Sequence, residues 1–176
     1  MQSQGIPTGS PISVIIANMV MDYIENTTIN SNYNKLLFYE RYIDVVLDSC
    51  PKKDADLVLS ILNDLNSKIQ FTKEMEKNNQ INFLDITIIR EPDNYITTNW
   101  FTKPTWIGRY INWNSNTPSQ YKSNVVNNML NRVLTFSNIK FRNSNLNKLK
   151  CALIKNDYTE KFVNKLIKRR IHRFYN

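Results

Sequence analysis

The chain has 176 residues, enough to bury a core in one domain or in two small ones. Its 2 cysteines and 1 histidine argue against a disulfide framework, a zinc site and histidine-based catalysis. The formal net charge of +8 is uneven, because residues 1–102 carry −5 and residues 103–176 carry +13. This asymmetry is typical of nucleic-acid binders, and an anionic membrane surface is the alternative partner.

Neither end of the sequence indicates targeting to a membrane. No apolar run approaches the roughly 20 residues that span a bilayer. The start, "MQSQGIPTGS", lacks the charged-then-apolar order of a signal peptide. We therefore expect an intracellular protein, nuclear or cytoplasmic, that is neither secreted nor transmembrane.

The first elements along the chain are a predicted loop, a helix and a hairpin. The loop "QGIPTGSPIS" leads into a helix that starts at Pro11 with Ser10 as its N-cap, and the apolar spacing predicts that this helix is buried. A polar link is expected at 26–34. The apolar runs at 36–38 and 42–47 then read as paired strands.

The middle of the chain predicts a short helix and a β-meander. Residues 54–66 have the spacing of an amphipathic helix. Three strand candidates follow, at 69–75, 81–90 and 95–101. The turn signals "KNNQ" and "EPDN" separate them.

After "TKPT" the sequence becomes basic and helical. Helices are predicted over 118–136, with Thr117 as the cap, near 144–155 and near 158–175. The expected apolar face of the first of these consists of Tyr121, Val125, Met129, Val133 and Phe136. The fold class is therefore α+β.

The stretch "FYERYIDVVLDSC" holds a carboxylate, Asp44, inside an apolar run. An ionised group in a buried strand is costly unless it is paired or binds a metal. Two interpretations stay open: a metal ligand, or a strand-end carboxylate that accepts backbone N–H groups.

The order of these motifs resembles the second half of the reverse transcriptase palm of Penelope-like retroelements. The resemblance is carried by "QGIPTGSPIS", "RYIDVVL" and "NFLDITIIREPDNYITTNWFTKPT". It continues in "RYINWNSNTPSQYKSNVVNNMLNRV", which is similar to the tract described in that family as a helix-turn-helix or thumb. It implies a partial palm over 1–104, built of antiparallel hairpins with two packing helices. A small basic thumb over 105–176 would follow.

The resemblance also implies roles for individual residues. The loop would lie against the incoming nucleotide and the template base, through Gln4, Gly5, Pro7, Gly9 and Ser10. Asp44 would be the first aspartate of an aromatic-x-Asp-Asp box and a ligand of catalytic Mg²⁺. The primer grip and other nucleic-acid contacts would come from Trp100, Lys103, Arg109, Tyr110, Lys122, Lys165, Lys168, Arg169 and Arg170.

Two departures from the family pattern argue against activity. Polymerases bind two Mg²⁺ ions about 4 Å apart through several carboxylates. Val45 stands where the second aspartate of the box is expected, and the chain begins after the strand that would carry the third. We expect Mg²⁺ only if residues from elsewhere complete the site, and no polymerase activity from this chain alone.

The other candidate residues also have purely structural interpretations, without a role in binding. Taken alone, the glycine-rich loop is a weak signal for ligand binding and reads rather as a tight turn before a core helix. The aromatic residues from Trp100 to Trp113 read as core rather than as base-stacking platforms. The predicted function is that of a reverse transcriptase fragment that binds primer-template nucleic acid. The alternatives are a non-catalytic nucleic-acid-binding module and a last helix that binds a membrane surface or a partner protein.

Overall fold

The computed structural model describes residues 10–32, 36–64, 66–93 and 95–176, except for the side chains of residues 28–32. The chain divides into two compact units, Met1–Met75 and Glu76–Asn176. This boundary differs from the one expected at residues 104/105, because the strand that carries Trp100 packs into the core of the C-terminal helices.

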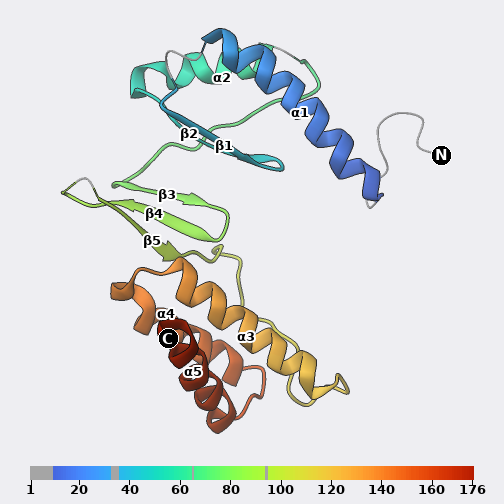
Figure 1. Cartoon of the computed structure of the whole chain (residues 1–176), viewed down its shortest axis with the longest axis vertical. Coiled ribbons are helices and arrows are strands. Elements are labelled where there is room, and N and C mark those ends of the chain that lie inside the picture. Colours follow the sequence, from blue (N-terminus) through green and yellow to red (C-terminus); the bar gives the residue numbers. More distant parts are fainter. Residues whose placement is uncertain (1–9, 33–35, 65, 94) are drawn as a thin grey trace. The chain divides into compact units, whose positions relative to one another are not determined.

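The first unit contains two α-helices and a β-hairpin (Figure 1). Its elements are α1 (Pro11–Asn32), β1 (Phe38–Tyr42), β2 (Val45–Ser49), the short 3-10 helix η2 (Lys52–Asp54) and α2 (Ala55–Asp64). Strands β1 and β2 pair antiparallel, with Tyr42 opposite Val45. Arg41 of β1 fastens the hairpin to α1 through ion pairs with Glu25 and Asp22.

Helix α1 begins at Pro11, as predicted, but two expectations about it are wrong. It continues to Asn32, through most of the region expected to be a polar link. It is also not a buried helix: among its described side chains only Ile24 falls in the buried class, and Met19 is 65% exposed.

The strand expected at 69–75 is absent from the described structure. The backbone of Phe71 in this segment pairs with a side chain, because Asn63 of α2 accepts from the Phe71 N–H at 2.6 Å and donates to the Phe71 carbonyl at 3.1 Å. A strand pattern in the sequence cannot reveal such a local partner.

The second unit joins a three-stranded sheet to three helices (Figure 1). Its elements are β3 (Gln80–Phe83), β4 (Ile86–Arg90), β5 (Ile96–Trp100), α3 (Ser119–Phe136), α4 (Ile139–Ile154) and α5 (Glu160–Tyr175). The strands are antiparallel in the order β3-β4-β5. The α+β class is therefore confirmed, and a three-stranded meander is present, although its strands are not the three expected.

The strand expected at 81–90 is two strands. A two-residue turn at Leu84 and Asp85 separates them, with Leu84 at φ 53°. Turns of this kind favour Asn and Gly. Because Leu84 is apolar, the sequence carries no signal for a turn at this position. The turn expected at 91–94 lies between β4 and β5, whereas the one expected at 77–80 leads into β3 and does not directly follow a strand among the described residues.

The helical boundaries also need correction. Helix α3 starts at Ser119 after Pro118, so Thr117 is not its cap. Helix α4 starts at Ile139, five residues earlier than expected, because Asn138 caps it by accepting from the Lys140 N–H at 3.2 Å. Helix α5 lies within its predicted range.

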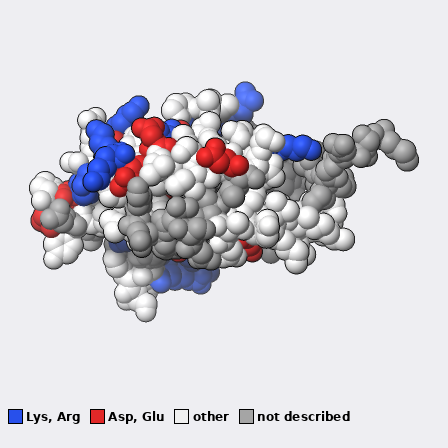
Figure 2. Space-filling view, turned by 90° about the horizontal axis from the view of Figure 1, so that it is seen from above, with Lys and Arg blue, Asp and Glu red and all other residues white. Residues whose placement is uncertain are grey.

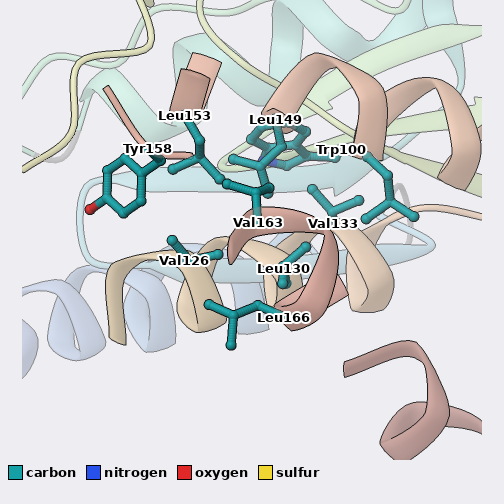
Figure 3. Packing of buried hydrophobic residues seen from close by; sticks show 10 residues of the cluster. Trp100, Val126, Leu130, Val133, Leu149, Leu153, Tyr158, Val163 and Leu166 are labelled. Atoms are coloured by element: carbon teal, nitrogen blue, oxygen red, sulfur yellow. The ribbon is translucent and has the colours of Figure 1, made fainter. Parts of the chain in front are cut away.

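The core of the second unit lies between the three helices and the end of β5 (Figure 3). Its labelled side chains are Trp100, Val126, Leu130, Val133, Leu149, Leu153, Tyr158, Val163 and Leu166. The buried face of α3 is turned by about one residue from the predicted one: Val126 and Leu130 are fully buried, whereas Tyr121 is 60% exposed. In the described ranges, no helix is long and apolar enough to cross a membrane.

Candidate nucleic-acid interface

Helices α3 and α4 are joined by a connection of two residues, Ser137 and Asn138. The sheet holds this connection in place, because the Asn138 N–H donates to the Thr98 carbonyl of β5 at 2.8 Å. The buried Asn145 of α4 donates to the Ser137 hydroxyl at 2.8 Å and to the Asn99 side chain at 2.7 Å. The angle between the two helices is therefore supported by buried polar contacts as well as by packing.

The connection between α4 and α5 depends on Asn156, which sequence reasoning missed. Its side chain donates to the carbonyls of Gly108 and Ala152, both at 2.7 Å, and accepts from the Tyr110 N–H at 3.1 Å. Its own carbonyl accepts from the Trp113 N–H at 2.9 Å. One asparagine thus fastens the segment before α3 to the start of α5. Nothing in the Asn-rich sequence distinguishes it from its neighbours.

Helix α5 presents a row of cations to solvent. We define the basic face of α5 as its exposed Lys161, Lys165, Lys168, Arg169 and Arg173. Intervals of four, three, one and four residues place them on one broad side of the helix, opposite the buried Val163. Among the described residues, none of the five has a carboxylate within 4.0 Å.

The acidic residue of α5 is already neutralised. Glu160, in the first turn, pairs with Lys150 of α4 at 2.6 Å, and the hydrogen bond from Lys150 lowers the pKa of that carboxyl. On the face in Figure 2, Lys and Arg side chains lie beside Asp and Glu side chains. The basic face of α5, in contrast, carries charge of one sign.

Three residues expected at the nucleic-acid surface have other surroundings. Lys122 is 8% exposed, and its ammonium donates to the carbonyls of Trp113 at 2.6 Å and Ser115 at 2.7 Å. Trp100 is 4% exposed and belongs to the core. Tyr110 packs against the same core, its hydroxyl is buried, and burial raises its pKa.

Arg170 also differs from expectation. It is half-buried on the side of α5 that carries Val163, and its Nε is buried without a hydrogen-bond partner among the described residues. We therefore leave it out of the basic face. The other predicted cations, Lys103, Arg109, Lys165, Lys168 and Arg169, are exposed.

The aromatic residues before α3 form clusters, in which Trp100 belongs to the core and Trp106 lies half-buried beside it. The rings of Trp100 and Trp106 meet edge to face at 5.9 Å, and the ammonium of Lys148 lies over both rings at 5.4 and 5.1 Å. Trp113 packs against Tyr158 and Phe162.

A pocket of about 280 Å³ opens beside the first of these clusters. Its lining includes Asp85, Trp100, Lys103, Trp106, Met129 and Arg132. Asp85 and Arg132 form an ion pair across 3.0 Å. The pocket lies wholly within the second unit.

Asp44 lies in the exposed turn between β1 and β2 rather than inside a buried strand. The described residues contain no group of three or more His, Cys, Asp or Glu side chains that could hold a metal ion. The described residues alone therefore do not supply the ligands of the two-metal centre that the family pattern implies. The predicted loop residues Gln4, Gly5, Pro7 and Gly9 lie outside the described residues, and Ser10 directly precedes α1.

Comparison with known protein families gives a match to residues 109–168, which span α3, α4 and most of α5. The matching family is the animal helix-turn-helix domain. Residues 109–168 form a helix-turn-helix domain. This agrees with the two-residue connection between α3 and α4, and it confirms the helix-turn-helix part of the sequence interpretation.

The comparisons give no support for a polymerase. No reverse transcriptase family matches the chain. No curated protein and no solved structure matches it either. The helix-turn-helix domain contains 11 of the Lys and Arg residues and 2 of the Asp and Glu residues, a net charge of +9.

Proposed function

We propose that the helix-turn-helix domain binds duplex nucleic acid and contacts the phosphates through the basic face of α5. The observation that carries this proposal is the row of five exposed cations without a carboxylate partner among the described residues. Basic side chains on one helix face are the usual electrostatic footprint of such binding.

The dimensions suit a duplex. Lys161 and Arg173 are twelve residues apart, about 18 Å along the helix at 1.5 Å per residue. A duplex carries one negative charge per roughly 1.7 Å of its axis, so every cation along this length finds phosphates within reach. The exposed side of α4 supports the same assignment, because Asn143, Ser144 and Asn147 are polar groups suited to base edges or sugars.

The test is the affinity for a fluorescent 20-base-pair duplex, as DNA and as an RNA–DNA hybrid, measured by anisotropy. A variant with Lys165→Gln, Lys168→Gln and Arg169→Gln loses three exposed contacts. At about 0.7 kcal/mol each, we expect roughly thirtyfold weaker binding.

A matched control changes Lys52, Lys53 and Lys68 to Gln, which removes the same charge from exposed positions of the first unit. We expect this control to bind nearly as tightly as the unaltered chain. Equal losses in the two variants would mean that net charge alone attracts the duplex, and the proposal for α5 would fail.

The amphipathic α5 leaves a membrane surface as the competing partner. Co-sedimentation with vesicles containing phosphatidylserine separates the two. Binding to vesicles without measurable binding to either duplex would contradict the proposal.

A second candidate, a remnant of a Penelope-like reverse transcriptase, is favoured by the hairpin that carries Asp44 at its tip, the position that the resemblance gives to a catalytic aspartate. We expect no primer extension on an RNA template with Mg²⁺, and none from Val45→Asp, because further ligands would have to come from outside the described residues. Incorporation of nucleotides by either protein would refute this expectation.

A further inference from the structure

The pocket beside Trp106 combines an apolar wall with cations at its edge. Trp100, Trp106 and Met129 supply apolar and aromatic surface, while Lys103 and Arg132 carry the positive charge. Lys103 is exposed, and no ion pair holds it among the described residues. A ligand that matches this arrangement has a flat apolar body and at least one negative charge.

The single acid of the lining does not cancel this preference. The Asp85 carboxylate is paired with the Arg132 guanidinium at 3.0 Å, so its charge is largely compensated within the pocket. Lys148, next to the lining, adds a further positive charge over the Trp100 and Trp106 rings, and its ammonium donates to the Thr102 hydroxyl at 2.6 Å. The neighbourhood is therefore net positive.

We infer that this pocket binds one unpaired nucleotide, with its base against the indole of Trp106 and its phosphate at Lys103. The choice of a nucleotide among aromatic anions rests on the proposed function of the neighbouring helix-turn-helix domain. The volume of about 280 Å³ lies near the lower end of ligand pockets, ~300–1,000 Å³, which suits one nucleotide rather than several.

This inference goes beyond phosphate contact by α5, because it gives the second unit a preference for strand ends or gaps. Base–aromatic contacts tolerate any sequence, since every base has an apolar face. A duplex with a short single-stranded overhang would then contact the second unit both at the basic face of α5 and at the pocket.

The first experiment titrates the full chain with AMP, ribose 5-phosphate and adenosine and follows tryptophan fluorescence. All three tryptophans lie in the second unit, and two of them line the pocket. We expect AMP to bind more tightly than either fragment. Ribose 5-phosphate binding as tightly as AMP would overturn the inference, and so would the absence of any response to AMP.

Two variants change AMP binding in opposite directions. Lys103→Gln removes the phosphate contact and should weaken AMP about tenfold. Asp85→Asn removes the carboxylate that pairs with Arg132, so the guanidinium becomes available to the phosphate. The affinity for AMP should then rise severalfold. Lys155→Gln, an exposed change outside the pocket, is the control and should leave AMP affinity unchanged. Equal effects of Lys103→Gln and Lys155→Gln would contradict the inference.

The second experiment separates this inference from the proposed function. A duplex with a three-nucleotide overhang should bind the full chain more tightly than a blunt duplex. Lys103→Gln should abolish that advantage, measured as the ratio of overhang to blunt-duplex affinity of the same variant, whereas Lys155→Gln should keep it. Blunt-duplex binding without an overhang advantage overturns only the pocket, whereas AMP binding without duplex binding overturns only the role of α5.

Discussion

Individual polar residues decide how the segment before α3 is held. Lys122 is an example, because its buried ammonium donates hydrogen bonds to two carbonyls of that segment. The same ammonium lies 5.6 Å from the centre of the Trp113 ring. A lysine buried in this way stabilises the fold and is unavailable to a phosphate.

We predict that Lys122→Met destabilises the second unit by about 1–3 kcal/mol, because the partly buried carbonyls of Trp113 and Ser115 lose their donor. Tryptophan fluorescence during urea unfolding reports on this unit alone, since residues 100, 106 and 113 all belong to it. Lys155→Met, an exposed change in the same unit, is the control. Unaltered stability of Lys122→Met would show that these carbonyls find other donors.

The contrast between Lys122 and Lys165 shows what the sequence reveals about single residues. Both were predicted to contact nucleic acid, and only Lys165 is exposed. Charge pattern identified the basic helix, because a solvated face and a buried stripe alternate along α5 with helical spacing. It could not identify Lys122, since the partners of that residue are backbone carbonyls of a segment without regular structure.

At the scale of elements, the turn between α3 and α4 is joined to β5. Asn145 contributes to this junction through donors to Ser137 and Asn99. The sheet therefore supports the helix-turn-helix domain, although the family match begins only at residue 109. Removal of the strands should affect the helices that follow them.

We predict that Asn145→Ala lowers the free energy of unfolding of the second unit by about 1–3 kcal/mol, since the Asn99 and Ser137 side chains lose a buried partner. Asn147→Ala, exposed on the same helix, provides the comparison and should change stability by less than about 0.5 kcal/mol. Similar free energies of unfolding for the two variants would argue that packing alone, without the hydrogen bonds of Asn145, holds the turn between α3 and α4.

Elements with strong helical periodicity were predictable from the sequence, as α3 and α5 show. The errors came where local contacts replaced regular pairing. Asn63 satisfies the backbone of Phe71, Leu84 occupies a turn position that rarely holds an apolar residue, and Asn138 starts α4 a full turn early. Such partners depend on tertiary structure, which periodicity does not encode.

At the scale of the whole molecule, charge is distributed by unit and by element rather than evenly. The helix-turn-helix domain carries +9, and α5, which extends beyond the matched residues, presents the five exposed cations of its basic face. Fold class followed from the sequence, because segments with strand pattern form antiparallel pairs in the first part of the chain and the basic C-terminal part has only helical pattern. The pocket did not, since its residues come from the β3–β4 turn, the segment after β5 and helix α3.

The most direct test of our account is the salt dependence of duplex binding. Counterion release predicts that the logarithm of the association constant falls linearly with the logarithm of salt concentration, with a slope of about −0.9 per phosphate contacted on DNA. We expect the variant of Lys165, Lys168 and Arg169 to have a slope shallower by about 2 to 3 than that of the unaltered chain, and the variant of Lys52, Lys53 and Lys68 to keep the original slope. Identical slopes for all three proteins, or binding independent of salt, would contradict the assignment of phosphate contact to the basic face of α5.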